Sequence, residues 1–239
     1  TGPSIAVSGF ARADEAATKW SQCNGSTLNV ALSVNGAVKT STSCSATDGA
    51  FSFTVAPPSA ANQLLSVFLD PAAAGDQGVL YTKNTDTTSD ITGLTVVQGR
   101  TWLQSESTAA LTNADLNTYD KTQDADIPAA SDGIALVLDP GIELHVNTSD
   151  TFAPGGNVTV GGSWHNLGSF TAGTGTVTFN AASGSRTLSG TLNGASAFYK
   201  VVFDTGSAGT ATWTIADPML VSAANAVDTL VIRYGTVTV

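Results

Sequence analysis

The sequence predicts an all-β protein, with an antiparallel β-sandwich in its first part and a β-solenoid, or parallel β-helix, in its last part. Three observations lead to this fold class. Short runs of β-branched and aromatic residues alternate with polar residues along the 239-residue chain. Asn, Gly, Asp and Pro separate these runs as tight-turn signals. Only 12% of the residues are charged, so hydroxyl and amide groups provide much of the solubility.

Residues 1–98 have the strand pattern of a small antiparallel sandwich. The expected strands are residues 5–10, 28–34, 50–55, 64–69 and 91–97. In the second strand Val30 and Leu32 lie on one face, and in the third Phe51 and Phe53 do the same. These two faces are expected to supply the core of the sandwich.

This first region resembles the carboxypeptidase-regulatory-like and Ig-like β-sandwich modules that are common in bacterial surface proteins. The stretches that carry the resemblance are SGFARADE, LNVALSVNGAVKTSTS, TDGAFSFTV and LLSVFLD. The resemblance implies a spacer or adhesion module and brings no activity with it.

The two cysteines, Cys23 and Cys44, both lie in this region. We favour a disulfide formed in an oxidising compartment over a metal site, because no nearby histidine or third cysteine completes a set of metal ligands. Two unrelated buried thiols are the alternative. The chain opens without Met or a leader pattern, and no apolar run is long enough to span a membrane. We expect a mature or excised segment of a secreted, extracellular or cell-surface protein.

Residues 99–130 have a weaker pattern and are expected to form a connector. Residues 111–116 are expected to form a helical turn with Thr112 or Asn113 as its cap. Acidic residues that could supply oxygen ligands for calcium follow, namely Asp115, Asp120, Asp124 and Asp126. The stretch lacks the central Gly and terminal Glu of an EF-hand loop. We therefore favour a solvated acidic connector over a calcium site.

Residues 131–239 contain many short strands of consistent phase. The expected strands are residues 134–138, 142–146, 157–160, 176–179, 199–203, 211–215, 230–232 and 236–239. Pairs such as Val177 with Phe179, or Leu230 with Ile232, place two apolar groups on one face. Stacked layers of such strands bury a continuous interior, which predicts the β-solenoid. A second sandwich is the alternative, because the strand spacing is irregular for a strict repeat.

This last region resembles the repeat region of large secreted bacterial surface proteins that contain parallel β-helix arrays. The resemblance rests on ELHVNTSDTFAPGGNVTV, WHNLGSFTAGTGTVTFN, RTLSGTL and FYKVVFDTGSAGTATWTI, and it extends to LTNADL and DADIP. It implies an extracellular scaffold or an adhesin-like polymer. Those proteins usually have many more layers, whereas this chain stops at GTVTV without a polar cap.

An uncapped layer exposes unpaired strand edges, so either the chain is cut from a longer protein or its open end docks onto a neighbouring copy. In the second case we expect the chain to assemble with other copies of itself into a homopolymer such as a surface filament or sheath. The first and last strands are the candidate assembly edges, with Ile5, Val7, Phe10, Thr236, Val237, Thr238 and Val239. The net charge of −10 argues against nucleic acid or an anionic membrane surface as a partner.

No residue pattern points to catalysis, so we expect no enzymatic activity, no metal and no cofactor. His145 and His165 are expected at the surface, because a zinc site needs three or four converging ligands. A polysaccharide-degrading enzyme is the weakest alternative, since its candidate groups are scattered without a common spacing. These candidates are Asp139, Glu143, Arg186, Lys200, Asp204, Asp217, Asp228 and Arg233.

A carbohydrate-binding adhesin that does not self-assemble is the main alternative function, with surface glycans as its partner. Tryptophan side chains stack on sugar rings when they are exposed. Trp213 shares the inward phase of Ile215 and is expected in the core, whereas Trp164 lies beside turn residues and is the candidate for glycan stacking.

Overall fold

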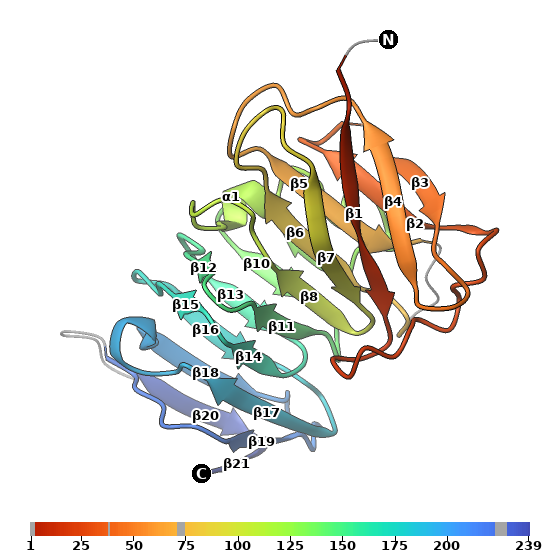
Figure 1. Ribbon diagram of the computed structural model, residues 1–239. Helices are drawn as coiled ribbons and strands as arrows, with labels where there is room; N and C mark the ends of the chain where they lie inside the picture. The colour runs from red at the N-terminus through yellow and green to blue at the C-terminus, as the bar shows by residue number, and fades with distance from the viewer. Residues whose placement is uncertain (1–2, 38, 71–74, 223–228) are drawn as a thin grey trace. The chain divides into compact units, whose positions relative to one another are not determined.

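The computed structural model describes residues 3–37, 39–70, 75–222 and 229–239 (Figure 1). The described chain is nearly all β, which confirms the predicted class. Among the described residues, no helix has the length and apolar character needed to cross a membrane. The chain divides into a first unit, Thr1–Ala109 with Thr118–Pro128, and a second unit, Ala110–Asn117 with Ala129–Val239. The expected connector is therefore shared between the two units.

The first unit contains the strands β1 to β8. They are β1 (Ile5–Arg12), β2 (Leu28–Val34), β3 (Thr40–Ser43), β4 (Ala50–Val55), β5 (Leu64–Leu69), β6 (Val79–Lys83), β7 (Ile91–Val97) and β8 (Arg100–Leu103). All five predicted strands are present within a few residues of their expected bounds. The predictions missed β3, β6 and β8, of which β3 is a short run of Thr and Ser.

The strands of the first unit form two sheets, one with the order β4-β1-β7 and one with the order β8-β6-β5-β2-β3 (Figure 1). The expectation of a purely antiparallel arrangement is wrong, because β1 pairs with β7 and β6 pairs with β8 in parallel. Parallel pairing needs a long connection between the two strands, which the chain supplies in both cases. One apolar cluster takes residues from both sheets, including Val7, Leu32, Phe53, Leu80 and Val96.

The second unit contains one short α-helix and strands β9 to β21. They are α1 (Asn113–Leu116), β9 (Ala129–Ser131), β10 (Leu136–Leu138), β11 (Glu143–Val146), β12 (Thr151–Phe152), β13 (Val158–Val160), β14 (Trp164–Asn166), β15 (Ser169–Phe170), β16 (Thr176–Phe179), β17 (Ser185–Gly190), β18 (Lys200–Asp204), β19 (Thr212–Ile215), β20 (Leu230–Tyr234) and β21 (Thr236–Thr238). The helical turn is confirmed, with Thr112 as its N-cap and Asp115 completing a capping box.

The strands of the second unit pair across successive passes of the chain. One sheet has the order β20-β18-β16-β13-β10-β9, and β11, β14, β17, β19 and β21 follow one another in a second sheet. Apart from β9, which runs antiparallel to β10, the strands of these two sheets are parallel to their neighbours (Figure 1). The short strands β12 and β15 form a third, parallel pair.

We call each pass of the chain a layer. The layers are β10 to β12, β13 to β15, β16 with β17, β18 with β19, and β20 with β21. Equivalent residues of successive layers lie side by side, so that Val160, Phe179 and Phe203 form one inward column. All three side chains are fully buried, and the rings of Phe179 and Phe203 stack at 5.1 Å. The interior of the unit is thus continuous from layer to layer.

Candidate functional site

The inward columns of the second unit end in exposed apolar side chains on its last layer. Leu230 lies in register with Val201, and Ile232 lies in register with Phe203. Val201 and Phe203 are fully buried, whereas Leu230 is 48% and Ile232 52% exposed. The same columns that form the core are therefore only about half covered at the last layer. We call this surface the end face and define it by Leu220, Leu230, Ile232, Tyr234 and Val239, all of which are exposed.

The backbone of the last layer is also open on one side. Strands β20 and β21 stand at the ends of their sheets, and they pair only with β18 and β19 within the described part of the chain. A strand in this position presents N–H and C=O groups that another strand can bind. The predicted edge residues Thr236, Val237 and Thr238 form β21, and Val239 follows them at full exposure.

An apolar groove of about 500 Å³ adjoins these edges. Its lining includes Ile215, Pro218, Met219, Leu230 and Val239, and apolar atoms provide most of the surface. Residues 218 and 219 were not predicted to take part in a site, because they belong to no strand and have no alternating pattern. The end face thus combines an apolar hollow with two strand edges that are open among the described residues.

The other predicted assembly edge, with Ile5, Val7 and Phe10, is wrong. These residues belong to β1, which pairs with β4 on one side and with β7 on the other. Ile5 and Val7 face the buried core of the first unit. A central strand has no free backbone groups along its length to offer to another chain, so β1 cannot donate an edge.

The predicted exposure of Trp164 is also wrong, because only 1% of this residue is exposed. It lies on β14 beside Leu144 and Leu188 of the neighbouring layers, whose side chains are buried. Its ring packs edge-on against Phe170 at 4.9 Å and Phe198 at 5.3 Å. Trp164 is therefore a core residue and is not available to stack on a glycan. Trp213 is fully buried, as expected.

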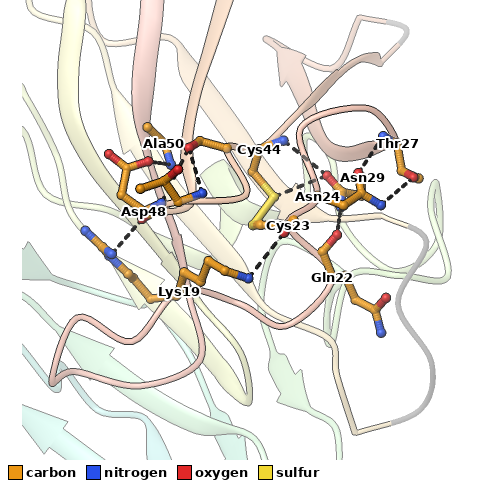
Figure 2. The surroundings of a disulfide bond; sticks show 12 residues. Lys19, Gln22, Cys23, Asn24, Thr27, Asn29, Cys44, Asp48 and Ala50 are labelled. Atoms are coloured by element: carbon orange, nitrogen blue, oxygen red, sulfur yellow. Dashed lines mark hydrogen bonds between the residues drawn. A yellow bond between two sulfur atoms is a disulfide. The ribbon is translucent and has the colours of Figure 1, made fainter.

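Cys23 and Cys44 form a disulfide, as one of the two interpretations predicted (Figure 2). Asn29 accepts a hydrogen bond from the backbone N–H of Cys44 at 3.3 Å, and its own amide donates to the Gln22 carbonyl at 2.6 Å. The Lys19 ammonium donates to the Cys23 carbonyl at 3.3 Å. The bridge closes a segment with a sequence separation of 21, which contributes roughly 3 kcal/mol on the chain-entropy model. Its role is structural.

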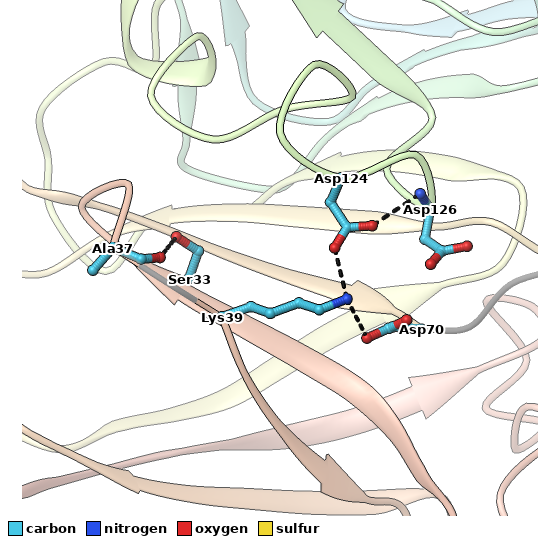
Figure 3. Close-up of polar contacts among 6 residues, drawn as sticks. All are labelled: Ser33, Ala37, Lys39, Asp70, Asp124 and Asp126. Carbon is cyan, nitrogen blue, oxygen red and sulfur yellow. Dashed lines mark hydrogen bonds and ion pairs between the residues drawn. The ribbon is translucent and has the colours of Figure 1, made fainter.

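The acidic residues after α1 hold their own loop and its neighbours in place. Lys39 lies between Asp70 and Asp124, with its Nζ 2.8 Å and 2.7 Å from the two carboxylates (Figure 3). Asp120 is fully buried and accepts hydrogen bonds from the N–H and hydroxyl of Thr122. The expectation of a solvated connector is wrong for Asp120, and the side chain of Asp124 is only 10% exposed.

Burial by itself lowers the pKa of Lys39, because it disfavours the charged ammonium. The hydrogen bonds to Asp124 and Asp70 outweigh burial, so that the pKa is raised well above its usual value. Lys39 is thus held as a cation that neutralises two carboxylates. The arrangement serves the packing of residues 118–128 in the first unit.

The candidate groups for catalysis are spread over several layers, and two of their carboxylates have structural partners. Asp217 accepts a hydrogen bond from the Gly190 N–H at 2.7 Å, and Asp204 pairs with Arg233 at 3.3 Å. Asp228 lies outside the described residues. The expectation that both histidines lie at the surface is wrong for His145, which is 1% exposed.

Comparisons with protein-family models, with curated proteins and with solved structures gave no match to this chain.

Proposed function

We propose that the chain is an extracellular structural protein, a self-assembling subunit or segment of a bacterial surface filament, sheath or adhesin. In this proposal the first unit is an Ig-like sandwich that acts as a spacer. The second unit is a β-solenoid whose end face joins another copy. The role is structural, and no enzymatic step belongs to it.

The layered pairing of the second unit supports the solenoid assignment. Successive strands of each sheet come from successive passes of the chain and keep the same inward residues in register. Contact of each layer with only its neighbours is the organisation of a solenoid, in which a layer is stabilised by the one above and the one below. The disulfide supports an oxidising, extracellular location.

The end face is the observation that carries the assembly proposal. Leu230 and Ile232 occupy the inward positions of two columns, in register with the buried Val201 and Phe203, yet about half of each is exposed. Burying such side chains contributes about 25 cal/mol per Å² of apolar area. A second copy that places a β-layer here would bury them and would pair the open edges of β20 and β21.

Substitution of the end face by lysine tests the proposal. We expect the wild-type chain to form oligomers or filaments in sedimentation velocity and negative-stain electron microscopy over a concentration series without reductant. The double variant L230K/I232K should remain monomeric with an unchanged circular dichroism spectrum, because the buried contact would require two unpaired ammonium groups. Deletion of residues 236–239 should have the same effect.

Val137→Lys is the matched control, because Val137 is an exposed aliphatic residue of the same sheet that lies on β10, away from the last layer. This variant should assemble as the wild type does. A wild-type chain that is monomeric at every concentration, or an L230K/I232K variant that assembles normally, would contradict the proposal.

A glycan-binding adhesin is the second candidate, and a polar groove on the outer face of the six-stranded sheet favours it. The groove has a volume of about 570 Å³, and its lining includes Asn157, Thr159, Thr178, Lys200 and Arg233. Among the described residues that line it there is no carboxylate, although the chain has 19 acidic and only 9 basic residues. Hydroxyl, amide and cationic groups in one groove suit an acidic polysaccharide.

A glycan array that includes neutral and uronate-containing sugars separates this candidate from a pure scaffold. A binding module should show a signal on acidic glycans that Lys200→Ala weakens, whereas Lys121→Ala, on the first unit, should leave it unchanged. A scaffold without glycan binding should show no sugar-dependent signal with any of the three proteins.

A further inference from the structure

Two histidines and one glutamate converge on one side of neighbouring layers in the second unit. His145 on β11 and His165 on β14 are direct partners in the parallel pairing of these strands. Their ring centroids are 4.7 Å apart, with the rings inclined at 76°. Leu144 and Trp164, the residues before them, are buried in the interior, so the two imidazoles lie on the opposite face of the sheet.

Glu143 belongs to the same face, because it precedes His145 by two positions on β11. Its Oε1 lies 3.6 Å from Nδ1 of His145. One nitrogen from each histidine and one carboxylate oxygen of Glu143 all lie within 4.8 Å of one another. The parallel register thus brings three potential metal ligands together from two strands.

These separations are close to those of a metal site. Zinc binds His nitrogen at about 2.0–2.1 Å and carboxylate oxygen at about 2.0–2.2 Å, so that ligand atoms in a tetrahedral site are about 3.3 Å apart. The separation between Glu143 Oε1 and His145 Nδ1 is near this value. The remaining pairs of ligand atoms lie within 4.8 Å of each other, so side-chain rotations must shorten each of these separations by at most about 1.5 Å.

We propose that Glu143, His145 and His165 form a zinc site that links two layers of the second unit. The ligand types select the ion, because two imidazoles with one carboxylate suit Zn²⁺, whereas Ca²⁺ and Mg²⁺ require mainly oxygen ligands. A water molecule would complete the tetrahedron. The site is separate from the end face, and its occupation does not depend on assembly.

The burial and the charge of the group suit a bound cation. His145 is buried, while the side chain of Glu143 is 19% exposed and His165 is partly exposed. With neutral imidazoles the three ligands carry one negative charge, which partly offsets the charge of Zn²⁺. A metal that joins β11 to β14 should hold these layers together and raise the melting temperature.

Isothermal titration calorimetry with ZnCl₂ tests the proposal on the untagged, chelator-treated full chain. Excess Mg²⁺ is included so that zinc held only by surface carboxylates is displaced. We expect one zinc ion per chain, a higher melting temperature with zinc, and Co²⁺ absorption bands of a tetrahedral site. Glu143→Gln and His165→Gln should each lower the zinc affinity by at least about tenfold and remove most of the zinc-dependent rise in melting temperature.

Glu106→Gln is the matched control, since it makes the same change at a glutamate of the first unit, and it should bind zinc as the wild type does. Circular dichroism of the metal-free variants checks that they fold. Glu143→Gln alters a partly exposed side chain, so at least this ligand variant should retain the fold. Absence of zinc binding by the wild type in excess Mg²⁺ would overturn the proposal. Equal zinc affinity of the wild type and both ligand variants would overturn it as well.

Discussion

Lys39 shows how one side chain can hold a loop in a protein with few charges. It lies between Asp70 and Asp124 and also lies 5.7 Å from the ring centre of Phe68. The side chains of the two aspartates are 13% and 10% exposed, so loss of the ammonium would leave two poorly hydrated carboxylates near each other. Its importance comes from this environment, because the sequence around Lys39 has no feature that marks an ion pair.

We predict that Lys39→Met lowers the free energy of unfolding by about 1–2 kcal/mol. This value lies between those for exposed and for buried ion pairs, because the side chain of Lys39 is 35% exposed. Methionine keeps the apolar contact with Phe68. Urea unfolding at pH 7 measures the change. Lys200→Met, at a lysine for which the described residues provide no ion pair, should change stability by less than about 0.5 kcal/mol. Equal effects of the two variants would refute the role assigned to Lys39.

The direction of the pKa shift adds a dependence on pH. Because the folded-state pKa of Lys39 is raised above its usual value of 10.5, its stabilising effect is fully present below pH 10.5 and is lost as the pH rises further. The stability difference between wild type and Lys39→Met should therefore be constant from pH 6 to pH 9.

Residue-level predictions from the sequence failed where long-range register decides the environment. Trp164 was expected at the surface because Gly, Ser and Asn surround it, yet the neighbouring layers bury it. The convergence of His145 with His165 was missed for the same reason. The two histidines are twenty residues apart in the sequence, as are Leu144 and its partner Trp164. This number of residues is the length of one layer, and it was the signal that could have revealed that the histidines lie side by side.

At the level of elements, the sequence predicted strands with apolar alternation and missed those without it. Residues 176–179 and 50–55 were found because their own pattern identifies an inward face. Strand β17, with the sequence SRTLSG, has no such pattern and forms because β14 and β19 lie in register on its two sides. Stacking therefore determines secondary structure that local propensity does not.

The corners between layers require glycine where backbones approach closely. A Cβ atom on Gly175 would lie 2.1 Å from the carbonyl oxygen of Gly156 in the layer before it. A Cβ on Gly156 would in turn lie 2.0 Å from the carbonyl oxygen of Ile134. The clashing atoms belong to the backbone, which cannot rotate away as a side chain does.

We predict that Gly175→Ala destabilises the protein by about 1–3 kcal/mol, because the added methyl group must push two layers apart. Thr174→Ala at the exposed neighbouring position is the control and should have little effect. Chemical unfolding monitored by tryptophan fluorescence measures both. A Gly175→Ala variant as stable as the wild type would show that the corner can relax.

Trp164 joins the aromatic residues of successive layers into one cluster, with Phe170, Phe179 and Phe198 around it. We predict that Trp164→Ala lowers the free energy of unfolding by about 3–5 kcal/mol, since it opens a cavity in this cluster. Trp164→Phe should cost clearly less because it keeps an aromatic ring in place. If Trp164→Ala instead kept full stability and lost a sugar-dependent signal, the side chain would have to be accessible after all.

At the scale of the whole molecule, an acidic protein that associates through an apolar surface must overcome repulsion between its copies. The chain has a net charge of −10 and an isoelectric point near 4.3, so two copies repel each other at pH 7. In the proposed assembly the end face would contribute mainly apolar side chains and backbone edges, whose attraction does not depend on opposite charges. Salt should therefore weaken the repulsion and leave the attraction in place.

We predict that self-association at pH 7 becomes stronger as the salt concentration rises from 10 mM to 150 mM, because the Debye length falls from about 30 Å to about 8 Å. Sedimentation velocity of the wild-type chain at fixed concentration measures the change. L230K/I232K is the control that separates assembly through the end face from general aggregation: it should stay monomeric at both salt concentrations, although each copy carries less net negative charge. Association that weakens as salt is added would mean that ion pairs hold the copies together, and the interface would then have to be sought among the charged residues rather than at the last layer.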